Sequence, residues 1–262
     1  MRRPKAAGGK AIHRVSAFAH GPGLTLGQAR TAEKSNEITA IPELLDALSL
    51  EGCIVTIDAM GCQKAIAAQV VRQECDYAPM VKNNQPSPAA AMEGFSGAAE
   101  QSGCRGVAHT HAQWIEKGHG RIETRRGVVT DDLRCLGEGH GWAGAKTLVM
   151  VEAVREINGV ASTERRYYIS SRLAGAERMG TVVRGHWGVE NGLHWSLDVV
   201  FGEDQARMRE GNSAENFSVL RRIALNLFRQ DDSVKAGVKN RRLLACCDDV
   251  YRQKLMGIQA VA

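Results

Sequence analysis

The stretch that most constrains this chain is Ile54–Gly61, with the sequence IVTIDAMG. Its β-branched and apolar run is too short for a helix and predicts a strand buried on both faces. Residues 63–72 then show helical spacing of small and apolar side chains. Asp58 therefore stands at the C-terminal end of a strand, where open α/β sheets bind ligands. The alternative is an Asp that caps the next helix or closes a turn.

Length, net charge and cysteine spacing limit the classes of protein to which this chain can belong. A chain of 262 residues can bury one domain with an insertion, or two small domains. The 34 Lys+Arg against 29 Asp+Glu give a net charge of +5, which permits a polyanionic partner without requiring one. The seven cysteines show no CxxC pair, so neither a disulfide framework nor a zinc ribbon is indicated. With no signal peptide and no long apolar run, we expect a soluble, cytoplasmic protein with no membrane partner.

The first third of the chain predicts a mixed sheet with helices packed on it. A strand over 11–19 and a second over 24–30 form a hairpin. A helix is expected from Pro42 to Leu48, because Pro42 fits best in a first turn, and Ser35 with Asn36 can cap a helix. A further strand spans Asp76–Lys82.

The middle of the chain changes character. Residues 86–103 are rich in Ala, Pro, Ser and Gly, as in a linker or a poorly ordered helix. Strands are expected over 120–130, 146–157 and 163–170, with Asn158–Gly159 as a hairpin turn. This β-rich block is interpreted as an insertion. After Leu173 the pattern is helical, through 184–201 and 214–229, and a basic tail follows.

A second acidic residue lies in the segment from Arg184 to Asp204. At about 100° per residue on a helix, His186, Glu190 and His194 share one stripe, which we expect to be buried against the sheet. If Glu190 lies beside Asp58, the two carboxylates can hold Mg²⁺ ions for phosphodiester chemistry. The alternative is a structural pairing of Glu190 with Arg184 or a nearby histidine.

Other candidates have plainer interpretations. His109, His111 and His119 lack a carboxylate or cysteine to complete a metal site, which favours a surface location. Along the strand over 120–130, Arg121, Arg125 and Arg126 alternate with Ile122, Glu123 and Val128, which predicts a basic face that contacts phosphates. Trp187 either packs in the core or stacks on a splayed base.

Seven segments, in order along nearly the whole chain, resemble those of DDE transposases of bacterial insertion sequences, in the group that includes the H-repeat-associated proteins. No single segment suffices, but together they are specific. They are KSNEITAIPELLD from Lys34, VTIDAMGCQKAIA from Val55, DYAPMVKNNQ from Asp76, KGHGRIETRR from Lys117, TERRYYISS from Thr163, RGHWGVENGLHWSLDVVFGED from Arg184 and NFSVLRRIALNL from Asn216.

This resemblance implies an α/β fold: an RNase H-like mixed sheet flanked by helices, interrupted by a β-rich insertion, with a helical C-terminal part. The implied parts are 11–85 (start of the catalytic domain), 86–172 (linker and insertion), 173–230 (helical return) and 231–262 (basic tail). Asp58 would be the second catalytic carboxylate and Glu190 the third, both ligands of Mg²⁺ or, alternatively, Mn²⁺.

The implied activity is cleavage and transfer of double-stranded DNA at insertion-sequence ends, and a homodimer is compatible with it. Residues expected to contact the DNA substrate are Lys82, Gln85, Arg121, Arg125, Arg184, His186, Trp187 and His194. Asn83 stands where the family usually has Gly.

The family's first catalytic Asp, in a motif of the IDGK type, has no counterpart here. The chain begins MRRPKAAGGK, and no Asp or Glu precedes Glu33. The resemblance therefore predicts an N-terminally truncated copy with impaired activity, unless the start codon is assigned too late. The alternatives are a catalytically dead DNA-binding remnant and a two-metal nuclease.

Overall fold

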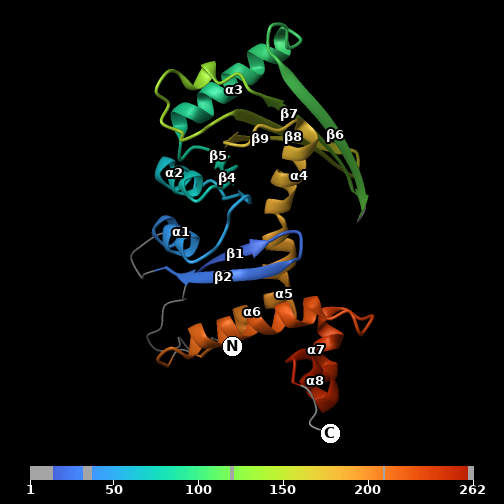
Figure 1. Cartoon of the computed structure of the whole chain (residues 1–262). Helices are drawn as coiled ribbons and strands as arrows, with labels where there is room; N and C mark the ends of the chain where they lie inside the picture. Colours follow the sequence, from blue (N-terminus) through green and yellow to red (C-terminus); the bar gives the residue numbers. More distant parts are fainter. Residues whose placement is uncertain (1–13, 32–36, 119–120, 209, 259–262) are drawn as a thin grey trace, which may run out of the picture. The chain divides into compact units, whose positions relative to one another are not determined.

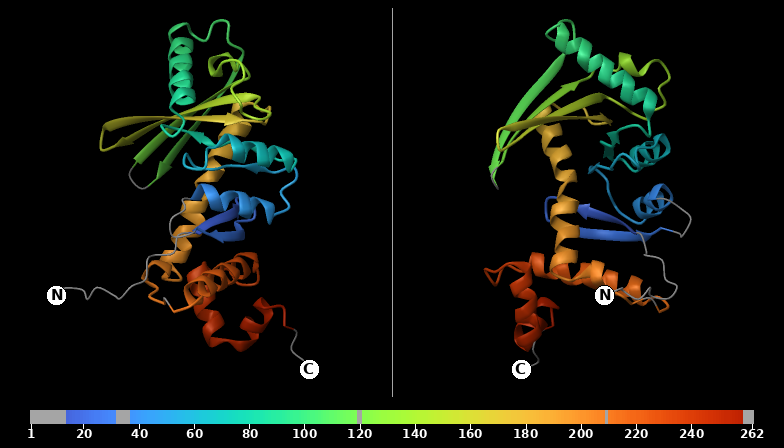
Figure 2. Two further views of the ribbon diagram at one scale, coloured as in Figure 1. Left: turned by 90° about the vertical axis from the view of Figure 1, so that its left-hand side faces the viewer. Right: turned by 180° about the vertical axis from the view of Figure 1, so that it is seen from behind.

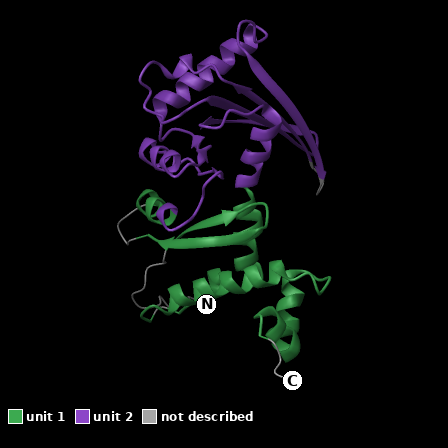
Figure 3. Ribbon diagram, viewed as in Figure 1, with its two compact units in different colours: residues 1–44, 187–262 green, residues 45–186 purple. Residues whose placement is uncertain are grey.

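The computed structural model describes residues 14–31, 37–118, 121–208 and 210–258. The chain divides into two compact units, Leu45–His186 and a second unit made of residues 1–44 and 187–262 (Figure 3). The expected strand residues 11–13, the expected cap at Ser35 and Asn36, and His119 lie outside the described residues.

The unit of residues 1–44 and 187–262 contains the predicted hairpin. Strands β1 (Arg14–Ala19) and β2 (Leu24–Arg30) pair antiparallel, which confirms the hairpin over the described residues. Helix α6 (Ser213–Gln230) packs on it. The Asn226 side chain accepts from the Thr25 N–H at 2.9 Å and donates to the Thr25 carbonyl at 2.8 Å, so the helix completes the hydrogen bonding of β2.

Helices form the rest of this unit. Segment η2 (Val189–His194), helix α5 (Trp195–Val199) and the short turn η3 (Glu203–Gln205) follow one another, and a core of Leu193, Leu197 and Leu225 joins them to α6.

Within the segment expected as a basic tail, residues 238–255 fold into α7 (Val238–Cys247) and α8 (Asp249–Leu255). Arg241 donates to the carbonyls of Phe228 at 2.5 Å and Val234 at 2.7 Å. Arg242 donates to the carbonyl of Val200. These guanidinium groups satisfy carbonyls at helix ends, so they belong to the folded structure.

Helix α1 (Glu37–Asp46) differs from its prediction. It begins at least five residues before Pro42, so the expected start at Pro42 is wrong. Its apolar face buries Ala40, Ile41 and Leu44. Burial of that face outweighs the one helical hydrogen bond that proline cannot donate.

The unit Leu45–His186 is built on a five-stranded antiparallel sheet in the order β5-β9-β8-β7-β6. Asn158 and Gly159, both at positive φ, make the predicted turn between β8 and β9. Strand β6 was not expected. Since β5 belongs to the predicted Asp76–Lys82 strand, the β-rich block extends that segment's sheet and does not form a separate one. The strands are β5 (Met80–Val81), β6 (His109–Gly118), β7 (Arg121–Thr130), β8 (Thr147–Ile157) and β9 (Val160–Ser170).

Two helices cover this sheet, α3 (Pro86–Gln101) on one face and α4 (Ala176–His186) on the other (Figures 1 and 2). The Ala-rich stretch, left open between linker and helix, is therefore helical over 86–101. The core beneath α4 includes Val129, Val149, Met179 and Val183. A single turn, η1 (Arg134–Leu136), lies between β7 and β8.

Strand β3 (Ile54–Val55) pairs in parallel with β4 (Asp76–Tyr77), and helix α2 (Lys64–Arg72) confirms the predicted helix. Hydrogen bonds from Ala78 to Val55 (2.9 Å) and from Met80 to Ile57 (3.0 Å) continue the pairing toward Asp58. Residues 54–57 are half-buried, so burial on both faces is corrected. The reason is that β3 pairs along one edge only within the described residues.

Within the part of the chain that the structure describes, no helix combines the length and apolarity needed to cross a bilayer. All seven cysteines fall in the described ranges and are free thiols.

Candidate active site

Asp58 lies in the turn that follows β3, with its side chain exposed. One carboxylate oxygen accepts the Gly61 N–H at 3.2 Å, so Asp58 does close the turn, as the plain interpretation holds. Burial, and secondarily the Asp58 charge, raise the pKa of the Cys62 thiol to about 12. Cys62 therefore stays neutral at the base of this loop, and Asp58 is the charged group at its surface.

The segment after β5 is tied to the Asp58 loop. The Asn84 amide donates to the Ala59 carbonyl, and the Gln85 amide donates to the Cys62 carbonyl at 2.9 Å. Gln85, an expected site residue, thus contacts the turn that begins with Asp58. Lys82 is exposed.

Histidine 186, at the end of α4, contacts the strand that leads to Asp58. Its Nδ1 lies 3.2 Å from the Thr56 hydroxyl. Thr56 precedes Asp58 by two residues. Within the unit Leu45–His186, His186 thus contacts the segment just before Asp58, and Gln85 contacts the loop just after it.

Glu190 lies in the other unit, in a π-helical turn. The Trp195 N–H donates to the Glu190 carbonyl, an i→i+5 bond that widens the turn. Glu190 and His194 are exposed, whereas Leu193 is fully buried. The expected burial of the His186–Glu190–His194 stripe is therefore wrong. The angular spacing of 100° per residue applies to an α-helix, and it does not hold across a π-helical turn.

Two glycines allow this wide turn to pack closely. A Cβ on Gly188 would lie 2.5 Å from His20 Nδ1, and one on Gly192 would lie 3.5 Å from the Phe18 ring. The Gly192 carbonyl also accepts from Arg229 at 2.7 Å. Trp195 is exposed, whereas Trp187 is half-buried. The close approach is at Gly188, where the neighbour is His20 in the turn of the β1–β2 hairpin.

Because Asp58 and Glu190 belong to different compact units, their meeting at one metal site stays a prediction. Among the described residues, no three His, Cys, Asp or Glu side chains are grouped to hold a metal ion.

The predicted basic face of β7 needs correction. Arg125 pairs in register with Trp114 and Ala153, on the face that α4 covers, while Arg126 lies on the α3 face. Consecutive strand residues point to opposite faces, so these two arginines cannot form one surface. The backbone of Arg121 begins β7.

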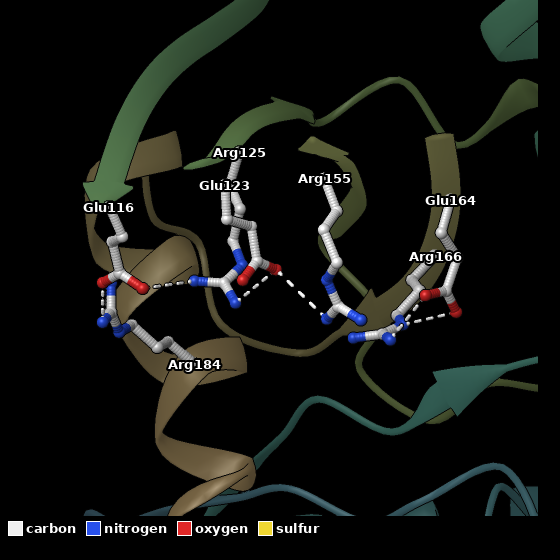
Figure 4. A network of polar contacts seen from close by, with 7 residues as sticks. All are labelled: Glu116, Glu123, Arg125, Arg155, Glu164, Arg166 and Arg184. Atoms are coloured by element: carbon white, nitrogen blue, oxygen red, sulfur yellow. Dashed lines mark hydrogen bonds and ion pairs between the residues drawn. The ribbon is translucent and has the colours of Figure 1, made fainter. Parts of the chain in front are cut away.

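On the α4 face, acidic side chains neutralise most of the arginines (Figure 4). Arg125 donates to Glu116 at 3.0 Å and to Glu123 at 2.7 Å. Arg184, expected to contact DNA, pairs with Glu116. Glu164 accepts from Arg166 at 2.7 Å, and this hydrogen bond is the main cause of its lowered pKa; the charges of Lys82 and Arg155 contribute.

The α3 face carries a second set of ion pairs. Glu100 of α3 pairs with Arg126 at 2.5 Å and Arg165 at 3.0 Å, and Arg165 also pairs with Glu152 at 2.7 Å. Next to them, a mainly apolar cavity of about 470 Å³ lies between α3 and the sheet. From α3, the side chains of Met92, Phe95, Ser96, Ala99 and Glu100 line it. His109 and His111 line its edge.

A family model described as a transposase DDE domain matches residues 1–227. The chain belongs to this family. It is 42% identical over 246 residues to the "H repeat-associated putative transposase YhhI" of Escherichia coli K12, covering 92% of this chain and 64% of that protein. It is 40% identical over 251 residues to the "Putative transposase YncI" of Escherichia coli O157:H7, covering 94% and 63% respectively. The chain thus spans slightly under two thirds of the length of these relatives.

Nothing in the local sequence identified several of the residues around the candidate site of this DDE domain. Thr56 and Asn84 contact His186 and the Asp58 loop through pairings that only the fold creates. Glu116 on β6 forms an ion pair with Arg184 on α4. The π-turn had one detectable hint, the two glycines at positions 188 and 192 within a helical pattern.

Proposed function

We propose that this chain carries the catalytic centre of a DDE transposase, which cleaves and transfers DNA strands at insertion-sequence ends. Asp58 and Glu190 are the proposed metal ligands. The observation that carries the proposal is the family match over residues 1–227, which includes both acids. We assign the activity of the longer relatives to this chain only as part of this proposal.

The proposed architecture is RNase H-like. The parallel pair β3–β4 supports it, because Asp58 then follows the carboxyl end of a strand. Open α/β sheets bind their ligands at that edge. The helices α2 and α4, which flank the strands of the same unit, are consistent with this architecture.

The contact of His186 with Thr56 supports a place for Glu190 near Asp58. Glu190 follows His186 by four residues, and four residues of fully extended chain span at most about 14 Å. The covalent chain therefore limits how far the Glu190 backbone can lie from the strand that leads to Asp58.

The exposed carboxylates of Asp58 and Glu190 fit the preference of Mg²⁺ for hard oxygen ligands, and Mn²⁺ is an alternative ion. When bound, the ions would supply activation of water or a 3′-hydroxyl and stabilise the leaving oxygen. We assign contacts with DNA to Lys82, Gln85, Arg121, His186, Trp187 and His194.

We also propose that residues 1–262 alone transfer strands weakly. The lack of any Asp or Glu before Glu33 leaves the family's first metal ligand without a counterpart in this sequence. Two carboxylates hold a pair of ions less tightly than three. The second candidate function is a DNA-binding remnant without catalysis.

The test measures Mn²⁺ binding by electron paramagnetic resonance, followed by cleavage of labelled DNA. Asp58→Asn and Glu190→Gln are each expected to weaken Mn²⁺ binding by about tenfold or more, since each removes a ligand. Glu93→Gln removes an exposed carboxylate on α3 and is the matched control.

Equal Mn²⁺ affinity in all three variants would overturn the proposed site. Metal binding with end-specific DNA binding and no cleavage supports the remnant. Cleavage of DNA that lacks insertion-sequence ends, at the same rate as DNA that has them, indicates a nuclease.

A further inference from the structure

The ion pairs on the α4 face form a continuous chain of alternating charge, here called the α4-face network (Figure 4). It consists of Arg184, Glu116, Arg125, Glu123 and Arg155. Glu116 lies between Arg184 and Arg125. Glu123 lies between Arg125 at 2.7 Å and Arg155 at 3.8 Å. The network thereby joins helix α4 to strands β6, β7 and β8.

The network is more than a set of exposed pairs. The Glu123 side chain is only 7% exposed and Arg125 is 28% exposed, so the central charges are largely removed from water. A carboxylate in that position depends on its guanidinium partners, because an unpaired buried charge is strongly destabilising. Arg125 already pairs with the carboxylates of Glu116 and Glu123, so it is poorly suited to bind a phosphate as well.

Helix α4 is held along its length by a single face of β6. The Ala176 N–H donates to the Thr110 hydroxyl at 2.9 Å. The Trp114 ring occupies the position where a Cβ on Gly180 would stand. Arg184 then meets Glu116. Residues 176, 180 and 184 lie four apart, so they form one face of the helix, and each has a contact on β6.

The last of these three contacts, at Arg184, lies two residues before His186. Without the pair of Arg184 and Glu116, the final turn of α4 would be held mainly by Val183 in the core and by His186 against Thr56. A helix end frays within its last turn unless side chains or packing hold it.

We propose that Glu116 and Arg184 are positioning residues. Their pair fixes the last turn of α4, and with it His186 and the point from which the chain continues to Glu190, six residues beyond Arg184. This inference rests on the proposed function, and it assigns Arg184 a role within the protein in place of the DNA contact expected from the sequence.

The first measurement is hydrogen exchange of residues 183–186 by mass spectrometry, which needs no metal or DNA. Glu116→Gln and Arg184→Gln are each expected to raise exchange about two- to fivefold, because both remove the same pair, whose side chains are 52% (Arg184) and 39% (Glu116) exposed. Arg184→Lys keeps the charge and is expected to retain most of the protection. Arg178→Gln, an exposed arginine on the same helix, is the matched control and should not change it.

The second measurement is the salt dependence of DNA affinity. A positioning role predicts that Glu116→Gln and Arg184→Gln leave the slope of log K against log[salt] unchanged, and that both weaken Mn²⁺ binding. A phosphate contact would instead lower the slope by about one in Arg184→Gln. It would also let Glu116→Gln bind DNA more tightly, since Arg184 is released.

These results separate the inference from the function on which it rests. Unchanged exchange in both variants, or the phosphate-contact pattern, overturns the positioning role even if the wild-type chain binds Mn²⁺. A wild-type chain that binds no Mn²⁺ overturns the proposed function, and raised exchange in both variants then still supports the structural part of the inference.

Discussion

Trp114 shows how single residues decide the spacing of the larger elements. The indole lies between strand β7 and helix α4, at positions where both present a glycine. A Cβ on Gly180 would lie 2.0 Å from Trp114 Cη2, and one on Gly127 would lie 3.0 Å from the same atom. The backbone of α4 can approach the sheet only because these side chains are absent, and the ring then fills the space.

At this scale we expect Gly180→Ala to destabilise the protein by about 1–3 kcal/mol, because the ring and the helix must move apart. Gly97→Ala on helix α3 meets open space and should stabilise by about 0.5–1 kcal/mol, since alanine favours a helix over glycine. Urea unfolding measures both. Similar changes in the free energy of unfolding for the two variants would show that packing against Trp114 does not limit how closely α4 approaches the sheet.

At the scale of elements, the C-terminal helices depend on a few polar contacts. The Tyr251 hydroxyl donates to Asp231 at 2.8 Å, and the Asp248 side chain caps α8 by accepting from the Tyr251 N–H at 3.0 Å. Tyr251 is buried with Phe228 and Ala245. Burial, together with the Asp231 carboxylate, raises the pKa of Tyr251 to about 12.

The sign of the resulting pH dependence follows from that pKa. An unfolded tyrosine titrates near 10, so the folded state favours neutral Tyr251, and this stabilisation is complete below about pH 10. It is lost as the pH rises from about 10 to about 12.

We therefore expect Tyr251→Phe to lower the free energy of unfolding by about 1–2 kcal/mol at pH 8. The difference from wild type should shrink above about pH 10. Urea titrations of both proteins at pH 8 and pH 11 measure it, and a constant difference would contradict the assignment. Tyr168, whose pKa is also raised to about 12 by burial, contributes equally to both proteins and cancels.

At the scale of the whole molecule, the proposed metal ligands come from both compact units. Asp58 lies in the unit Leu45–His186, and Glu190 lies in the unit of residues 1–44 and 187–262. Each unit contains two tryptophans, Trp114 and Trp142 in one and Trp187 and Trp195 in the other. A shared ion would link the stabilities of the two units, which fluorescence can report.

We expect Mn²⁺ at 100 times its dissociation constant to stabilise the folded chain by about 2.7 kcal/mol, because the ion binds the folded state. EDTA should remove this effect, and Asp58→Asn or Glu190→Gln alone should reduce it to about 1.4 kcal/mol or less, because a tenfold weaker site is only tenfold above its dissociation constant. Thermal unfolding followed by tryptophan fluorescence measures it. Undiminished stabilisation in either variant would indicate a metal site elsewhere.

The sequence alone determined those features that depend on neighbouring residues. The β1–β2 hairpin, helix α2, the β8–β9 turn at Asn158–Gly159 and most of α6 followed from periodicity and turn chemistry. The family also followed from the order of its motifs, and it is confirmed. Local backbone preferences act within a few residues, so such features need no knowledge of the fold.

Only the tertiary structure decided the rest. It placed Pro42 inside α1, formed β6 from a polar stretch and opened the π-turn at Glu190. Above all, it supplied Glu116 as the partner of Arg184. The physical reason is that burial and charge neutralisation depend on which distant segments meet, and the same arginine is a DNA contact or an internal partner according to the carboxylate beside it.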